Sequence, residues 1–239
     1  MTAHFAIPAT TFVLRRVVQE RVDLAYGGLT PPTVSVEPPP RPPATSAAGN
    51  GQPQPEPAGL HLFLHHAAPN PAFRNAFEPH VSSAGRRTRR SPLALDLQYM
   101  LAATGADLER EALLGLGITA LTRHGIVPRP KIAAILGAIV VPPVPQHLLD
   151  TLPTEALDQQ PEQITVSQAP VDVDLSTKIW SALQSPLRPA AYFLVTTVFL
   201  EVTETYPAAP EVAKAVVGVR QGVGPGAALD TLSTTGAAP

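Results

Sequence analysis

Apolar residues near the start of the chain recur at the spacing of one helix face. The positions that share this face are Phe12, Val13, Val17 and Val22. They predict an amphipathic helix over residues 11–24, with Thr10 or Thr11 as its N-cap. Pro8 is expected to prevent an earlier start, and Gly27 is expected to end the helix.

Alternation of apolar and polar residues is clearest in the middle of the chain. The apolar positions of this alternation are Leu93, Leu95, Leu97, Tyr99 and Leu101. Asp96 and Gln98 occupy the opposite face, so the pattern predicts a strand over residues 93–101. Shorter apolar or β-branched runs predict further strands over residues 33–36, 60–65, 164–167 and 190–202.

Helical spacing predicts three more helices. Asp107 is expected to cap the first, which runs to residue 121, and the second covers residues 131–139. The third begins at Asp174 or Ser176. Helices and strands alternate without strict βαβ regularity, which favours an α/β (α+β) fold: a mixed sheet of about five strands with helices packed on one or both faces.

Proline marks the domain organisation. Residues 37–58 hold eight of the 29 prolines and no aliphatic side chain larger than Ala, so this segment cannot bury enough apolar surface to repay its ordering. After residue 204 the sequence turns to Ala, Gly, Pro, Thr and Val. We therefore expect one α/β domain over residues 1–203, interrupted by a Pro-rich loop at 37–58, and a low-complexity tail over residues 204–239.

The charge balance argues against general nucleic-acid binding. The chain has 17 Lys and Arg against 19 Asp and Glu, a formal net charge of −2, whereas nucleic-acid-binding domains usually have a basic excess. Cysteine is absent, which excludes disulfide scaffolds, thiol nucleophiles and cysteine-based zinc sites. Charged residues make up only 15% of the chain, below the usual share, so we expect part of the surface to be covered in an assembly.

The sequence predicts no membrane span. The two longest apolar runs, residues 132–141 and 190–200, are each about ten residues long, against about 20 for a helical span. The first ten residues lack the basic and apolar regions of a signal peptide. We therefore expect a soluble protein that is made in a cytoplasm.

The sequence also predicts no catalytic, cofactor or metal site. It contains no phosphate-binding loop, nucleophile elbow or dinucleotide fingerprint. His61 and His65 are four residues apart on a predicted strand, so their Cα atoms lie about 13 Å apart, which is awkward for one metal ion. We therefore expect a non-enzymatic protein whose histidines are structural or on the surface.

Four arginines form the densest basic stretch of the chain: Arg86, Arg87, Arg89 and Arg90. They are candidates for contact with an acidic protein surface, because guanidinium groups bind carboxylates in bidentate pairs. A solvated loop and contact with nucleic acid are the alternatives. No aromatic residue interleaves with these arginines, which weakens the nucleic-acid alternative.

Asp96 lies among leucines on the predicted strand over residues 93–101. If this face is buried, the carboxylate needs a partner. Arg74 and Arg188 are the candidates. An exposed edge or a solvated face is the alternative.

A family resemblance adds to this picture. Three stretches carry it: LHLFLH at 60–65 with PNPAFRN at 69–75; SPLALDLQYML at 91–101; and LSTKIWSALQSP at 175–186 with RP at 188–189 and AY at 191–192. In this order they resemble the N-terminal domain of the cap, or tail-terminator, proteins of extracellular contractile injection systems, the phage-tail-like particles of the virulence-cassette and antifeeding-prophage types. The motif residues expected to have structural roles are Asn70, Pro71, Arg74, Asn75, Asp96, Trp180, Pro186, Arg188 and Tyr192.

The resemblance implies a tail-terminator-like fold and a structural role. Such caps form hexameric rings on the last layer of inner tube and contractile sheath and stop their polymerisation. The implied partners are the sheath and inner-tube proteins, with strand addition between sheath extensions and an exposed sheet edge. The implied location is the bacterial cytoplasm during assembly, within a particle that can be released. An adaptor or cargo-loading module of the same particle, acting through its Pro-rich segment, is the alternative.

Overall fold

The computed structural model describes most of the chain up to residue 200 and two short strands beyond it. The described residues are 5–41, 56–73, 80–81, 87–89, 92–140, 142–144, 147, 150, 157, 160, 162–200, 215–220 and 229–234, with the backbone alone at 80–81, 87–89, 215–220 and 229–234. The chain divides into two compact units, residues 1–78 with 91–203, and residues 79–90 with 204–239.

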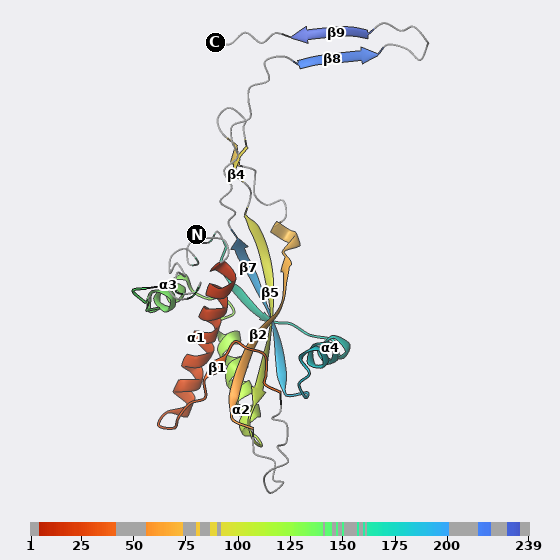
Figure 1. The fold of residues 1–239 in the computed structure, drawn as a ribbon. Coiled ribbons are helices and arrows are strands. Elements are labelled where there is room, and N and C mark those ends of the chain that lie inside the picture. The colour runs from red at the N-terminus through yellow and green to blue at the C-terminus, as the bar shows by residue number, and fades with distance from the viewer. Residues whose placement is uncertain are drawn as a thin grey trace. The chain divides into compact units, whose positions relative to one another are not determined.

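A five-stranded mixed sheet forms the centre of the first unit (Figure 1). Its strands are β1 (Val34–Ser35), β2 (Gly59–Pro69), β5 (Leu93–Thr104), β6 (Thr165–Gln168) and β7 (Ala190–Leu200). The spatial order is β1-β2-β5-β7-β6, with β1 parallel to β2 and every other neighbouring pair antiparallel. The predicted fold class, a mixed α/β sheet of about five strands, is confirmed. The final residues of the strand predicted over 190–202 lie outside the described residues.

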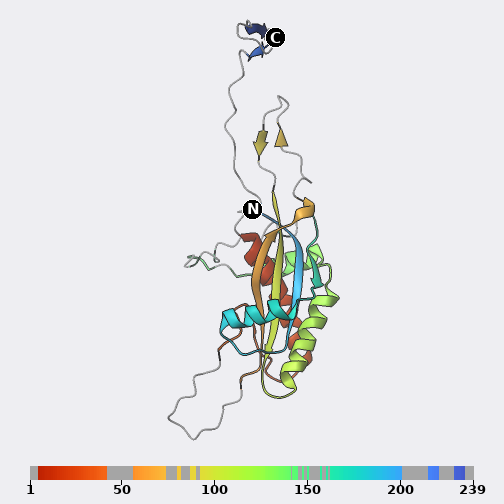
Figure 2. The same ribbon diagram turned by 90° about the vertical axis from the view of Figure 1, so that its right-hand side faces the viewer.

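The two faces of this sheet carry different numbers of helices. The helical elements are α1 (Ala6–Tyr26), the 3-10 helix η2 (Pro71–Phe73), α2 (Glu109–Arg123), α3 (Arg129–Gly137) and α4 (Val173–Leu183). Two views at right angles place α1 and α2 on one face and α4 on the other (Figures 1 and 2). One face is therefore backed by a helical layer and the other by a single helix.

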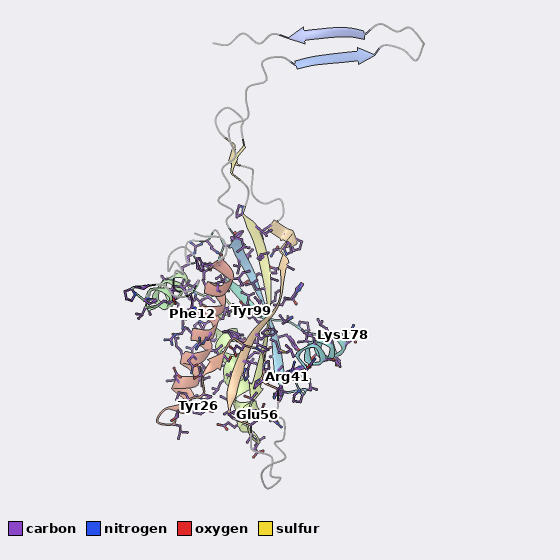
Figure 3. All side chains as sticks on the ribbon, viewed as in Figure 1. Phe12, Tyr26, Arg41, Glu56, Tyr99 and Lys178 are labelled. Atoms are coloured by element: carbon purple, nitrogen blue, oxygen red, sulfur yellow. The ribbon has the colours of Figure 1, made fainter. Side chains whose placement is uncertain are left out.

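The larger core fills the space between the sheet and α1, α2 and α3. Its buried members include Leu14, Val18, Leu62, Leu101, Leu121, Ile132 and Phe193. Tyr99, labelled in Figure 3, also lies in this core. Its hydroxyl is 2.7 Å from Oγ1 of Thr11 on α1. Burial raises the pKa of the Tyr99 phenol, because the ionised form would lose its hydration. This hydrogen bond therefore ties α1 to β5 inside an otherwise apolar layer.

The alternation predicted over residues 93–101 separates the two faces of the sheet. Leu97, Tyr99 and Leu101 belong to the larger core, whereas Met100 belongs to a second cluster under α4. The strand continues past the alternation to the end of β5, because its pairing with β2 continues there. The sequence thus predicted which residues share a face but placed the end of the strand too early.

The predicted start of α1 is wrong. The helix begins five residues earlier, and Pro8 is its third residue, where a missing N–H does no harm because first-turn N–H groups have no intrahelical acceptor. Thr10 is not a cap, since its Oγ1 donates to the carbonyl of Ala6 at 2.8 Å, and Thr11 makes the equivalent bond one residue on. The predicted end is confirmed, because Gly27 follows α1 with a φ of 53°.

The predicted caps of two other helices are also wrong. Leu108, not Asp107, holds the N-cap position of α2, since Asp107 adopts a left-handed turn with a φ of 49°. The helix α4 begins upstream of both candidates, Asp174 and Ser176. The Ser176 hydroxyl instead lies 2.9 Å from the Tyr192 hydroxyl. Tertiary contacts and turn geometry therefore override the local capping signal at these positions.

The second unit contains two strand pairs that the sequence did not predict. β3 (His80–Val81) pairs antiparallel with β4 (Arg87–Arg89), and β8 (Ala215–Arg220) pairs antiparallel with β9 (Leu229–Thr234). No strand was predicted over residues 74–90, and residues 204–239 were expected to form a low-complexity tail. Valine in β8 favours a strand, but the surrounding Ala, Gly and Pro conceal this preference.

A helix that spans a bilayer needs about 20 predominantly apolar residues, and the described residues contain four α-helices. Within those residues, none combines the length and the apolar character that crossing a bilayer requires.

Candidate functional site

Asn70 joins the end of β2 to β5. Its backbone N–H donates to the carbonyl of Ala94 at 2.9 Å, and its Nδ2 donates to Oδ1 of Asp96 at 2.8 Å. Its own Oδ1 accepts from the backbone N–H of Ala72 at 2.8 Å, which fixes the turn that Pro71 begins. Asn70 therefore acts as a structural joint between two strands and η2.

Among the described residues, the partner of Asp96 is the amide of Asn70. Asp96 is half-buried and accepts from Asn70. Arg188, one of the two predicted candidates, binds other groups, so that candidate is wrong. The other candidate, Arg74, lies outside the described residues, as does Asn75.

Arg188 holds both ends of the Pro-rich segment. The residue is only 7% exposed. Its Nε donates to Oε2 of Glu56 at 3.1 Å, and its Nη2 donates to the carbonyl of Pro40 at 2.9 Å and also to Oε1 of Glu56. Its Nη1 donates to Oγ of Ser185. This bidentate pair, buried on the Arg188 side, fastens residues near both ends of the segment to the chain that enters β7.

Trp180 and Tyr192 form the centre of the second core, under α4. The members of this core are Met100, Ala102, Trp180 and Tyr192, with Phe63, Val171, Ile179, Leu183 and Ala190 packed against them. The ring of His65 meets that of Tyr192 edge-on, with 5.9 Å between the ring centroids. Pro186 is exposed beyond the end of α4. Of the described motif residues, Trp180, Arg188 and Tyr192 are thus buried, Asn70 and Asp96 are half-buried, and Pro71 and Pro186 are exposed.

Nothing in the described residues gathers into a metal-binding group of three or more His, Asp or Glu side chains. Burial lowers the pKa of His61 and of His65, because each imidazolium would lose hydration. Oγ1 of Thr104 is 3.5 Å from Nε2 of His61. Both rings therefore belong to the packing around the second face of the sheet.

The arginine cluster falls in the second unit. Arg87 and Arg89 are the ends of β4, whose backbone alone is described, and Arg86 and Arg90 lie outside the described residues. The contact between this cluster and a partner therefore stays a prediction.

The outer edge of β2 is a surface that sequence reasoning missed. β1 pairs only with Leu60 and His61, so among the described residues the rest of this edge has no neighbouring strand. Beside the edge lies a groove of about 550 Å³, here called the β2-edge groove. Its lining is mainly apolar and consists of Ile7, Pro8, Thr11, Phe12, Arg15, Val36, Phe63, Leu64 and Ile139.

The β2-edge groove combines two features that suit an extended peptide. An unpaired strand edge presents main-chain N–H and C=O groups, which form hydrogen bonds with an added strand. Phe12 of α1 stands beside the sheet at this groove (Figure 3), and Phe63 and Leu64 line it from β2. The one sequence signal for this site is that the predicted strand over residues 60–65 is largely apolar on both faces.

Comparisons with known proteins place the chain as follows. A family model described as the Pvc16 N-terminal domain matches residues 9–214. Among solved structures, the chain is similar to the sheath/tube terminator of the PVC extracellular contractile injection system in its extended state. The identity is 14%, the TM-score is 0.46, and the match covers 87% of this chain and 64% of that chain.

The chain is also similar to the tube-terminating cap of the anti-feeding prophage. The identity is 12%, the TM-score is 0.44, and the match covers 85% of this chain and 59% of that chain. The chain therefore spans less than two thirds of the length of either solved structure. No curated protein matches it.

Proposed function

The chain belongs to the Pvc16 N-terminal domain family, and on this premise we propose that it is a structural cap of a contractile injection system. In this role it binds the last layer of sheath and inner tube and stops their polymerisation. The match over residues 9–214 carries the proposal, because it includes the whole central sheet, α2, α3, α4 and all but the first three residues of α1. The protein acts by binding rather than by catalysis. It joins the particle in the bacterial cytoplasm and leaves with it.

A ring of six copies is the proposed assembly. A growing tube and sheath offer a ring of equivalent unsatisfied surfaces, and a cap of matching symmetry covers them with many weak contacts acting together. Native mass spectrometry of the full chain is expected to give a hexamer. A stable monomer would instead favour the adaptor or cargo-loading role.

The β2-edge groove is the proposed contact for an extended segment of the sheath protein. Val36 lines the groove and is 39% exposed, so Val36→Asp places a charge in an apolar contact without disturbing the core. The matched control is Val173→Asp, at an exposed valine on α4. We expect Val36→Asp to lower incorporation into particles about tenfold or more and Val173→Asp to leave it unchanged. Equal incorporation of the two variants would remove the groove from the interface.

The arginine cluster is the second proposed contact. Replacing Arg86, Arg87, Arg89 and Arg90 by Glu is expected to weaken docking, because a basic stretch in a chain of near-zero net charge complements an acidic surface. The free energy of unfolding is expected to change by less than about 1 kcal/mol, because we expect these charges to be solvated and solvated charges contribute little to stability. Normal incorporation of the fourfold variant would assign these arginines to solvent.

Deletion of the gene tests the cap function itself. Purified particles would be compared by electron microscopy with and without the gene, and with the gene restored. We expect tails of heterogeneous length, or tails that disassemble early, when the gene is absent. Tails of normal length with normal density at the end away from the baseplate would contradict the proposal.

A further inference from the structure

A polar pocket lies where α1, α2 and α3 meet, outside every site described above. It has a volume of about 300 Å³, and we call it the three-helix pocket. Its polar lining is Glu20 and Arg21 of α1, Thr119, Arg123 and His124 at the end of α2, and Lys131 of α3. Three helices thus contribute ionisable side chains to the three-helix pocket.

The three-helix pocket has an excess of positive charge. Its charged groups are three cations and one carboxylate, a local balance of +2 in a chain whose total is −2. Lys131 Nζ lies 2.8 Å from Oε2 of Glu20, so this pair is neutralised. Arg21 and Arg123 have no ion pair with any described residue. Two guanidinium groups that share a pocket repel each other, and an anion placed between them would relieve the repulsion.

Arg21 gives a second, independent sign that an acceptor is missing. Its Nε–H is buried and has no hydrogen-bond partner among the described residues. A buried donor without an acceptor is unfavourable, and a charged donor more so. A carboxylate matches the planar fork of a guanidinium and accepts two of its N–H groups.

His124 reports the positive potential in the pocket. Its pKa is lowered by burial first, and then by the charges of Lys131 and Arg123, while Glu20 acts in the opposite direction. Its Nε2 lies 3.4 Å from Nζ of Lys131, a distance at which a neutral ring accepts from the ammonium. At neutral pH the ring therefore adds no charge, and the excess comes from the two arginines.

The walls of the three-helix pocket define the rest of the ligand. Val17, Leu24 and Ala120 line it beside the charged groups, and Leu24 is 72% exposed at its rim. An anion on a short hydrocarbon stem fits such a lining. None of the lining residues is Phe, Tyr or Trp, and His124 is the one aromatic ring among them, so a nucleic-acid strand would find little surface for base stacking.

We propose that the three-helix pocket binds the carboxylate of a glutamate side chain that a partner protein presents. The arginines receive the carboxylate, and the apolar walls receive its methylene groups and a neighbouring apolar residue. This contact goes beyond the capping role, since it assigns a defined acidic anchor to a face of the molecule that the sheet edges do not include.

The test is a titration of the full-length, ¹⁵N-labelled protein followed by NMR of the arginine Nε–H signals. The probe is the blocked peptide acetyl-Ala-Leu-Glu-Leu-Ala-amide, and its control is the same peptide with Gln in place of Glu. We expect saturable shifts of the signals of Arg21 and Arg123 with the Glu peptide and at least tenfold weaker binding of the Gln peptide. Raising the salt concentration to about 0.5 M is expected to weaken the Glu peptide selectively.

Matched variants assign the binding to the pocket. Arg123→Gln and the double variant with Arg21→Gln are expected to lower the affinity for the Glu peptide at least tenfold. Arg123 is exposed, so the single variant keeps the fold if the double variant does not. Arg16→Gln and Arg110→Gln, at exposed arginines of α1 and α2 outside the pocket, are expected to leave it unchanged.

Four outcomes would overturn the proposal. These are the absence of shifts with the Glu peptide, equal affinity for the Glu and Gln peptides, equal shifts with succinate, and tighter binding of a short single-stranded DNA. The last two would assign the pocket to small dicarboxylates or to nucleic acid. Because no particle is needed, the outcome is independent of the test of the cap function.

Discussion

Replacing Trp180 by Ala should show how much of the stability depends on the second core. Trp180 is only 3% exposed and packs under α4 with Met100, Ala102 and Tyr192. An aromatic side chain of this size buries roughly 150–250 Å², which corresponds to about 4–6 kcal/mol at about 25 cal/mol per Å². Since alanine keeps a methyl group, we expect a loss of about 3–5 kcal/mol in the free energy of unfolding.

Trp180→Phe is the matched control. The Nε1–H of Trp180 is buried and has no hydrogen-bond partner among the described residues. Phenylalanine removes this unsatisfied donor and keeps most of the apolar contact, so we expect a loss of less than about 1.5 kcal/mol.

Urea unfolding followed by far-ultraviolet circular dichroism measures both variants with one probe. Trp180 is the only tryptophan, so the fluorescence of the unaltered protein reports on this core alone and should be shifted to the blue of tryptophan in water. A loss below about 1 kcal/mol in the Ala variant, with fluorescence typical of exposed tryptophan in the parent, would refute the packing of α4 described above.

Two further predictions concern packing and pH. A Cβ on Gly117 would lie 2.6 Å from Cδ2 of the buried Leu101, so Gly117→Ala should lower the free energy of unfolding by about 1–3 kcal/mol. The control is Gly115→Ala, which has open space around it and should raise the free energy of unfolding by about 0.5–1 kcal/mol. Equal thermal midpoints of the two variants would contradict the overlap with Leu101. Burial lowers the pKa of His61 and His65 in the folded state, so the unfolded chain binds more protons below about pH 6.5. The free energy of unfolding should therefore fall between pH 7.5 and pH 5.5, and a slope in His61→Asn as steep as in the parent would exclude His61 as a cause.

Periodicity predicted the elements with the most repeats of their pattern. The alternation that includes Leu97, Tyr99 and Leu101 identified β5 and its buried face, and the valines of the first predicted helix identified α1. Such patterns are set by burial on one face, which repeats over several residues. Helix starts are set by one or two residues, and Pro8 and Thr10 each allow more than one position, so the start of α1 was predicted wrongly.

Contacts between distant residues were beyond sequence reasoning. Asp96 accepts a hydrogen bond from Asn70, which is 26 positions away, and Arg188 donates one to Glu56, which is 132 positions away. Both pairs exist because β2, β5 and β7 lie side by side, a topology that local patterns do not specify. The β2-edge groove was missed for the same reason, since the short β1 leaves it open. The family resemblance was drawn from ordered motifs and did not require this topology. The family match over residues 9–214 confirms the resemblance.

The contacts of Arg188 make the Pro-rich insertion a site for engineering. Pro40 and Glu56 are held by the same side chain, so the contacts with the domain fix the two ends of the stretch between them and do not depend on its length. The entropy of closing a loop grows slowly, by about 0.6 kcal/mol for each doubling in length. A fluorescent or electron-dense tag could therefore replace residues 42–55 if both flanking contacts are kept. In the proposed ring of six copies, six tags would mark the capped end of the particle and make its polarity visible in a micrograph.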